Sequence, residues 1–504
     1  MTTSNEGINH QKLFWGSCLS LITTAFAFSV TREIQTDIQV EFLLSNANLG
    51  LFGGVFFWGF VLSQVIFSPL CDTIGIRPIV RGAFVGHVSG ALLMMFASNF
   101  TMLWVGSLLT GVGAGLVEAG CNPLIVALYP KTKTHKLNMF HMWFPYGNVI
   151  AALLALGLSA MDVAWETRLM LILIPAVIYG VMMFTAKYPQ TEGVAAGVST
   201  GDMLKACFTS PLMLMMLVMM LITASMELPP SSWVPPYLES SGTIPGILVF
   251  AFVFGIMGTL RLLAGPVERV LRPTGILFGG AVLATIGLYA FSQAESTFML
   301  FFTAAIWAAG IAYFWPTMLG YVSENNPKSG ALGLGMMGAM GMMAAAFVTP
   351  YVGTVSDELG HDRIPATETV SILNEVSRTL PTLSATGDDA AAINEAVTMA
   401  NQALSEMQNG ALPAVTTTQA LRAIDKVKSL PAVASSSASS AANSVSEIIH
   451  AADTYGQRSA LKGLSLFGII LIVVFGALLL RDRARGGYKA EDLLSEHAEE
   501  ATSY

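Results

Sequence analysis

Long apolar runs alternate with short polar connections along this chain, and twelve of the runs are long enough to cross a lipid bilayer. A membrane-spanning helix needs roughly 20 apolar residues. The runs lie at approximately 12–40, 47–70, 78–97, 101–129, 137–160, 167–187, 210–238, 244–265, 274–293, 297–322, 329–353 and 460–480. A polar segment, residues 354–459, interrupts the series. The pattern predicts an all-α membrane protein with twelve transmembrane helices.

Lysine and arginine collect on one side of this predicted bundle. They follow the even-numbered runs, at Arg77, Arg81, Lys131, Lys133, Lys136, Lys187, Lys205, Arg269, Arg272, Lys328, Arg481, Arg483 and Arg485. The opposite connections hold mainly acids, at Asp162, Glu166, Glu239 and Glu295. Because positive charge marks cytoplasmic loops, we expect a multi-pass protein of the cytoplasmic (inner) membrane. Both termini would be cytoplasmic, with residues 354–459 outside.

The composition limits the class of function. The chain has 53% hydrophobic and 12% charged residues, whereas soluble proteins carry about 25% charged residues. The net charge of −8 does not suit a nucleic-acid partner. The four cysteines have no metal-ligand spacing, and no nucleophile–base set is visible. We therefore expect a protein that is not an enzyme and that holds neither a metal nor a cofactor.

An internal repeat divides the chain into halves. SPLCDTIGIRPIV (Ser68 to Val80) follows the second run, and AGPVERVLRPTGI (Ala264 to Ile276) follows the eighth. Each has an acid and then a basic residue before proline, so two pseudo-symmetric six-helix bundles are expected, as in many transporters. Residues 1–187 would form the first bundle and 188–209 a cytoplasmic linker. Residues 210–353 and 460–480 would form the second bundle, and 481–504 a cytoplasmic tail.

The polar segment 354–459 has its own helical signals. Helices are expected around 366–379, 387–406, 417–428 and 443–454, whereas the Ser/Ala-rich run Val433 to Ser444 has the composition of a flexible linker. Both a disordered loop and a small helical cap are compatible with this pattern.

One apolar run, Leu109 to Pro130, contains a carboxylate near its middle. Glu118 lies there with Asn122 one helical turn later, and glycines at 111, 113, 115 and 120 allow close approach of neighbouring helices. A charge at the centre of a bilayer costs at least about 2.5 kcal/mol, so it faces a polar cavity or a partner. Glu118 is therefore a functional-site candidate, the alternative being a structural pair between helices.

Other polar and aromatic side chains fall inside the predicted spans. They are Arg32, His141, Glu227, Trp233, Trp307 and Trp315. Prolines after Glu227 must kink its helix, and kinked membrane helices are tolerated where they are buried or line a cavity. Each residue also has a structural alternative: Arg32 can extend to the outer surface, His141 can hydrogen-bond between helices, and the tryptophans can face lipid. Arg261 is expected to be a gate or structural residue.

SPLCDTIGIR, with Asp72, Gly75 and Arg77, resembles the cytoplasmic loop signature of the major facilitator superfamily. GAGLVEAGCNPLIVALYP and KLNMFHMWFPYGNVIAA resemble the fucose permease-like sugar:proton symporters within it. LRLLAG, WPTMLGYV and VTPYVGTVSDELG add to the match. The resemblance implies the major facilitator fold and gives Glu118 the position of a fourth-helix carboxylate that handles substrate and protons. The chain departs from that family at the first-helix carboxylate, which aligns with Arg32, and at a fifth-helix Asn, which aligns with Phe144.

We expect a secondary active transporter that imports a small polar solute, with a sugar as the leading candidate, by proton-coupled alternating access. Glu118 would carry the proton. The substrate would contact Arg32, Asn122, His141, Glu227, Trp233, Trp307 and Trp315. Asp72, Gly75, Arg77, Arg261, Glu268 and Arg269 would form the cytoplasmic gate and loop motif. The expected partners are the small molecule, protons and the bilayer, with the protein as a monomer. The alternatives are an anionic solute such as a sugar acid bound by Arg32, an efflux transporter, and a sensor that uses the 354–459 insert.

Overall fold

A computed structural model describes residues 7–34, 37–38, 41–42, 46–241, 246–407 and 413–490. All regular secondary structure in these described ranges is helical. Eleven helical segments are long and apolar enough to cross a membrane, and a shorter apolar helix, Leu248–Leu262, lies at the place of the predicted eighth span. The prediction of an all-α membrane protein is confirmed.

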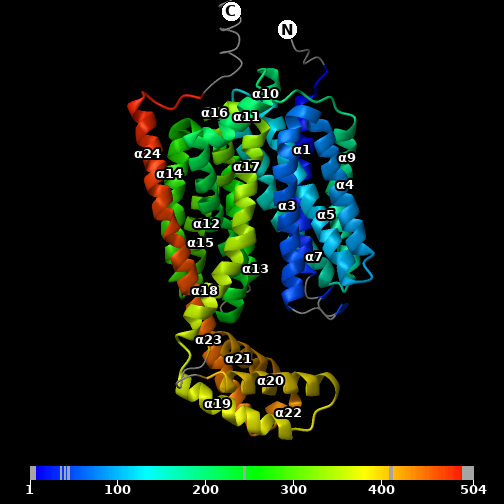
Figure 1. Ribbon diagram of the computed structural model, residues 1–504, viewed down its shortest axis with the longest axis vertical. Helices are drawn as coiled ribbons and strands as arrows, with labels where there is room; N and C mark the ends of the chain where they lie inside the picture. Colours follow the sequence, from blue (N-terminus) through cyan, green and yellow to red (C-terminus); the bar gives the residue numbers. More distant parts are fainter. Residues whose placement is uncertain are drawn as a thin grey trace, which may run out of the picture.

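The first half of the chain builds one bundle (Figure 1, blue to cyan). Its spans are α1 (His10–Glu33), α3 (Asn46–Ile74), α4 (Ile76–Met95), α5 (Phe100–Leu128), α6 (Lys133–His141) with α7 (Trp143–Ser159), and α8 (Trp165–Arg168) with α9 (Met170–Phe184). Helix α1 packs against α7 and α9, and α5 packs against α3 and α4. The glycines of α5 permit this packing, since a Cβ atom on Gly111 would lie 2.1 Å from the carbonyl oxygen of Phe56.

The second half repeats this arrangement. After α10 (Glu192–Ala195) and α11 (Thr200–Thr209), its spans are α12 (Pro211–Ser241), α13 (Gly246–Leu262), α14 (Ala264–Ser292), α15 (Thr297–Ile311) with α16 (Phe314–Asn325), η1 (Pro327–Ser329) with α17 (Gly330–Met343), the π-helix η2 (Ala344–Val348) and α18 (Thr349–His361), and α23 (Ala438–Ser465) with α24 (Phe467–Ala484). Helices α14 and α15 pack together as α4 and α5 do, and α12 packs against α17 as α1 does against α7.

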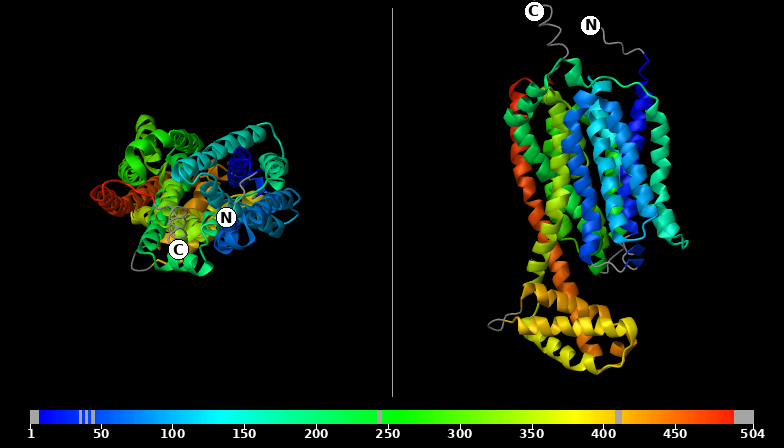
Figure 2. Two further views of the ribbon diagram at one scale, coloured as in Figure 1. Left: turned by 90° about the horizontal axis from the view of Figure 1, so that it is seen from above. Right: turned by 45° about the vertical axis from the view of Figure 1, so that its right-hand side comes forward.

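Residues between α18 and α23 form a separate small helical layer at the end of the molecule opposite the two termini (Figure 1; Figure 2, right). It contains α19 (Ala366–Thr379), η3 (Leu380–Thr382), α20 (Gly387–Ser405), α21 (Ala414–Val427), α22 (Pro431–Ala434) and the first part of α23. These helices share their own hydrophobic core, in which Leu373, Leu421 and Val445 are fully buried. We call this layer the insert, and we name the two ends of the molecule the insert side and the terminus side.

The expectation of a flexible linker at Val433 to Ser444 is wrong. Helix α23 begins at Ala438 and runs without a break to Ser465. Its buried positions Ala438, Ala441, Ala442, Val445 and Ile449 have the spacing of one helical face. The apolar contacts of this face with the insert core therefore order a segment whose composition alone suggests flexibility.

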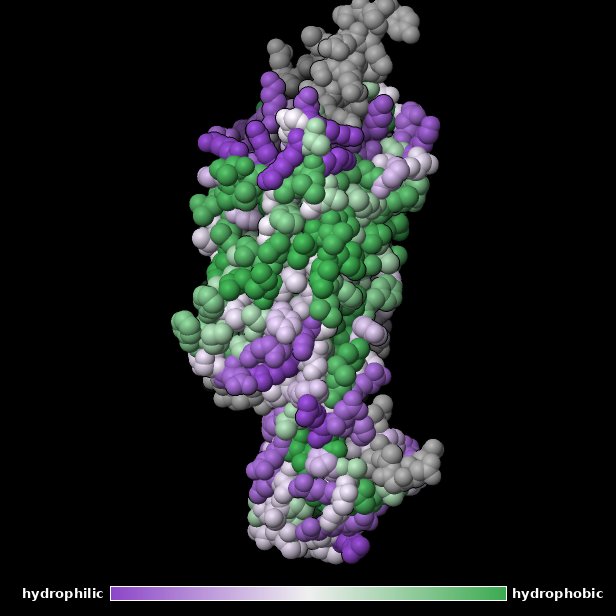
Figure 3. Space-filling model, turned by 90° about the vertical axis from the view of Figure 1, so that its left-hand side faces the viewer, coloured by the Kyte–Doolittle hydropathy of each residue, from purple (hydrophilic) through white to green (hydrophobic). Residues whose placement is uncertain are grey.

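On the face seen in Figure 3, the two bundles carry a broad hydrophobic belt between more hydrophilic ends, and the insert lies outside this belt. The exposed apolar side chains of the bundles include Leu62, Ile66, Val181 and Val473. A belt of this kind matches the hydrocarbon layer of a bilayer.

Candidate functional site

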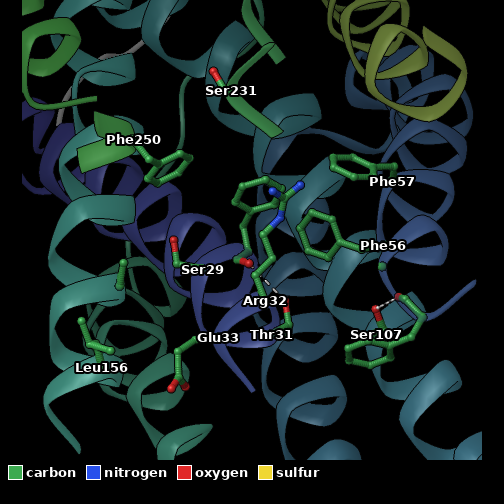
Figure 4. A pocket seen from close by; sticks show the side chains of 14 residues that line it. Ser29, Thr31, Arg32, Glu33, Phe56, Phe57, Ser107, Leu156, Ser231 and Phe250 are labelled. Carbon is green, nitrogen blue, oxygen red and sulfur yellow. Dashed lines mark hydrogen bonds between the residues drawn. The ribbon is translucent and has the colours of Figure 1, made fainter. Parts of the chain in front are cut away.

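A cavity of about 480 Å³ lies at the centre of the protein, between the two bundles on the insert side. Helices α1, α3, α5 and α7 of the first bundle line it together with α12 and α13 of the second. Ser29, Arg32, Phe56, Phe57, Ser231 and Phe250 surround it (Figure 4). The residues come from the insert-side ends of α1 and α7, which places the cavity off the midplane.

Phenylalanine dominates the wall of this cavity. Five rings line it, at Phe28, Phe52, Phe56, Phe57 and Phe250. A smaller adjoining space reaches Phe60, Phe144 and Phe254. Apart from Phe144, which the family resemblance aligned with a fifth-helix Asn, these residues were not singled out from the sequence. The spacing of Phe52, Phe56 and Phe60 puts three of these rings on one face of α3, but it does not tell whether that face meets a cavity or lipid.

Arg32 is the cationic side chain of this aromatic cavity. Its guanidinium lies 4.1 Å from the centre of the Phe28 ring, a cation–π contact that fixes its position. Arg32 occupies the last turn of α1, where the helix dipole favours a positive charge. In the described part of the chain it has no ion pair.

The neighbouring carboxylate does not neutralise Arg32. Glu33 points away from it (Figure 4). The Glu33 carboxylate lies 2.5 Å from Nη1 of Arg168, and Asp37 lies 2.5 Å from Nη2 of the same guanidinium. Arg168 is only 2% exposed, so this cluster binds the end of α1 to α8. The positive charge of Arg32 is thus left available to a ligand.

Glu118 lies in a buried network on the terminus side of the cavity. Asn122 Nδ2 donates to its carboxylate at 2.6 Å, and Nε2 of His141 lies 3.1 Å from Asn122 Oδ1 and 3.8 Å from Glu118 Oε2. The one-turn spacing of Glu118 and Asn122 along α5 creates the first contact. The three predicted site residues are therefore together, although none of them lines the large cavity.

Arg261 joins the two bundles. It donates to the carbonyl oxygen of Ala312 at 2.5 Å and to that of His141 at 2.8 Å. Ala312 lies four residues before Pro316, and His141 lies four residues before Pro145. Because proline has no N–H, neither carbonyl oxygen receives the usual helical hydrogen bond from that position. The same arginine lies 3.9 Å from Glu227. The sequence predicted a gate or structural residue at this position, and the structure places Arg261 at the break in both α6–α7 and α15–α16.

The tryptophans lie apart from the cavity. Trp307 is fully buried and donates from its indole N–H to the carbonyl oxygen of Met226 at 3.0 Å. Trp315 is 7% exposed and packs against Gly341. The side chain of Trp233 lies outside the described part of the structure. Of the predicted substrate-contacting residues with described side chains, only Arg32 lines the large cavity.

The loop-motif residues lie together at the terminus side. Gly75 has a φ of +84°, which permits the sharp turn between α3 and α4. In the second bundle Arg272 has a φ of +59° just before Pro273, at the corresponding turn. Asp72 lies against the start of α17 at Gly330, and Arg77 donates to the carbonyl oxygen of Phe184 at 3.1 Å. Glu268 and Arg269 lie near the start of α14.

Polar contacts close the two bundles against each other on this terminus side. Lys133 forms a 2.7 Å ion pair with Glu192 and donates to the carbonyl oxygen of Ser323 at 3.2 Å. Thr134 Oγ1 donates to Glu324 at 2.8 Å. A cavity on one side and closed contacts between the bundles on the other are the features of a membrane transporter that is open on one side and closed on the other.

The chain belongs to the Major Facilitator Superfamily, whose sequence pattern matches residues 13–350. It is 24% identical over 352 residues to a protein named gentisate transporter from Corynebacterium glutamicum. This match covers 64% of this chain and 77% of that protein. Its fold is similar to that of the transporter FucP in the outward conformation, with a TM-score of 0.58 and 17% identity over 69% of this chain and 92% of that one. The proton:xylose symporter XylE gives a TM-score of 0.56 and 14% identity over 68% of this chain and 89% of that one.

Proposed function

We propose that this chain is a secondary active transporter of small organic anions with an apolar body, and that aromatic carboxylates are the substrate class its cavity fits best. The observation that carries the proposal is Arg32, an arginine without an ion pair in the described structure, set in a wall of phenylalanine rings. This substrate class falls within the anionic alternative left open by the sequence.

The chemistry of the cavity supports this class. A guanidinium binds a carboxylate through two parallel hydrogen bonds, and it is more weakly hydrated than an ammonium group. Phenylalanine rings stack face-to-edge on an aromatic ring. A sugar offers many hydroxyl groups and would leave most of them facing these rings, at a cost for each unpaired polar group. The relative named gentisate transporter is consistent with the proposal, because gentisate combines an aromatic ring with a carboxylate.

The transport step is a rocking motion of the two bundles. If the terminus side is cytoplasmic, as the distribution of lysine and arginine predicts, the cavity belongs to an outward-facing state that is ready to receive solute from outside. Import then requires that the contacts of Lys133 and Thr134 break while the insert-side ends of the bundles approach each other.

A proton at Glu118 would couple this motion to the proton gradient. Glu118 and Glu227 are both buried and lie in different bundles. Arg261 lies 3.9 Å from Glu227 and donates to the carbonyl oxygen of His141, whose ring lies 3.8 Å from Glu118. Two ionised carboxylates with one guanidinium would leave a net negative charge in a low-dielectric region, which is costly. One bound proton would remove that charge, which supports this cluster as the coupling site.

Proton-coupled sugar import is the second candidate. The polar network of Glu118, Asn122 and His141 favours it, since these groups could hydrogen-bond sugar hydroxyls. The solute would have to pass beyond the aromatic cavity to reach them.

Uptake into proteoliposomes separates the two candidates. Purified protein would be reconstituted and tested with radiolabelled gentisate and benzoate, with neutral benzamide as the matched control, and with fucose and xylose. We expect uptake of the two carboxylates and none of benzamide. Sugar uptake that excess benzoate fails to inhibit would refute the organic-anion proposal.

A further inference from the structure

A line of residues continues from the aromatic cavity toward the terminus side along the contact between the two bundles. On α3, Phe57, Phe60, Gln64 and Ser68 follow one another at intervals of three and four residues, which places them on one helical face. On the opposite segment, Ala345 and Met342 line the smaller space beside the cavity, and Gly338 and Gly335 follow at the same helical spacing. This shared seam leads from the cavity to the closed side.

Two polar side chains in the seam have no hydrogen-bond partner among the described residues. Gln64 and Ser68 are both fully buried, and neither the amide group of Gln64 nor the hydroxyl of Ser68 is hydrogen-bonded in the described structure. Most buried polar groups in proteins are paired, and an exception calls for an explanation. Leaving such groups unpaired makes the closed seam less stable than an apolar seam of the same shape.

Both side chains face the opposite bundle. A Cβ atom on Gly338 would lie 2.3 Å from Gln64 Nε2, and one on Gly335 would lie 1.8 Å from Ser68 Oγ. The glycines of α17 therefore let the seam close directly over the two polar groups. When α3 and α17 separate, these groups become part of the newly opened surface, one and two helical turns beyond Phe60.

We propose that Gln64 and Ser68 form a second substrate-binding station, which is covered in the present state and exposed when the terminus side opens. Their amide N–H and hydroxyl groups would donate to the carboxylate oxygens of the solute after it leaves Arg32. This inference deepens the proposed function and rests on it for the identity of the ligand. The position of the station on the transport path rests on the geometry alone.

Ser63 supplies a matched control. It lies on the same helix and is equally buried, but its hydroxyl donates to the carbonyl oxygen of Phe60 at 3.0 Å and packs against Gly115 of α5, within the first bundle. Opening of the seam should not expose it.

The first experiment measures exposure without any substrate. Ser68→Cys and Ser63→Cys would be made in a protein whose Cys18, Cys71, Cys121 and Cys207 are replaced by serine. Inside-out and right-side-out membrane vesicles would be treated with a membrane-impermeant maleimide. We expect Ser68→Cys to be labelled from the terminus side about tenfold faster than Ser63→Cys. A tenfold ratio corresponds to a difference of about 1.4 kcal/mol between the free energies of exposing the two thiols. Equal labelling of the two cysteines would overturn the inference, whatever the protein transports.

The second experiment measures binding from each side with gentisate as the probe. In Gln64→Leu, which keeps the approximate size of the side chain, the half-saturating concentration for exchange from the terminus side should rise about tenfold, the effect of losing one hydrogen bond to a charged group. The value from the insert side should stay unchanged. Equal values for Gln64→Leu and the wild type on both sides would overturn the station. Failure of the wild type to transport gentisate would instead refute the proposed function.

Discussion

Replacement of Arg32 by glutamine removes the one charge on which the proposed substrate class depends. The amide of glutamine can still donate a hydrogen bond, but it lacks the positive charge and the planar fork of the guanidinium. The cation–π contact with Phe28, at 4.1 Å, disappears as well, so the new side chain is less firmly positioned. The substrate carboxylate would then enter an aromatic cavity without a counter-charge.

The expected loss follows from the surroundings of Arg32. Truncating one partner of a buried charge pair costs about 2–5 kcal/mol, and the lower end applies because the side chain of Arg32 is only partly buried. At about 1.4 kcal/mol per factor of ten, affinity for benzoate should fall about 30-fold or more. Isothermal titration calorimetry on the purified protein would measure the dissociation constants of both forms.

Two controls make this result specific. Arg81→Gln makes the same substitution at a residue that binds the carbonyl oxygen of Phe184 on the terminus side, and it should leave the affinity for benzoate unchanged. The thermal stability of Arg32→Gln should remain close to that of the wild type, because Arg32 forms no ion pair with any residue that the structure describes. An affinity for benzoate within a factor of about two of the wild-type value, well below the loss expected for a charge pair, would refute the assignment of Arg32.

Three further predictions concern the buried network, the helix packing and the insert. Glu118→Gln should abolish proton-driven accumulation of substrate but leave counterflow intact, and full accumulation by this variant would exclude Glu118 as the coupling site. Gly111→Val should lower the yield of folded protein in size-exclusion chromatography, because the valine side chain would meet the backbone of Phe56. Gly54→Val is the control and should not lower the yield, since the space around Gly54 is open. Equal yields of the two variants would contradict the packing described. Leu421→Ala should lower the free energy of unfolding of the insert by about 2–5 kcal/mol, measured by hydrogen exchange of the amides of α19–α21. Benzoate uptake should continue in this variant. Loss of uptake would show that the insert takes part in transport.

The spans of this protein could be predicted from the sequence because each needs only a sustained apolar run, and eleven helical segments of the described residues have one. The contact between Glu118 and Asn122 was also predictable, since residues four apart on a helix are neighbours. The terminus-side contacts of Lys133 with Glu192 and Ser323 were not, because they join residues 59 and 190 positions apart.

The aromatic cavity escaped prediction for a different reason. A phenylalanine facing lipid and one facing a cavity have the same hydropathy, so the sequence does not distinguish Phe56 from the exposed Phe302. The prolines at 145 and 316 were visible as helix breakers. Nothing in the sequence indicates that a single arginine, Arg261, would bind both of the carbonyls that they free.

The most direct test of the organic-anion account is an experimental structure of the protein with benzoate bound, determined by cryo-electron microscopy. We predict ligand density in the cavity between α1, α3 and α13, with the carboxylate within hydrogen-bonding distance of the Arg32 guanidinium and the ring among Phe56, Phe57 and Phe250. Density beside Glu118 and His141, with Arg32 left free of ligand, would contradict the account.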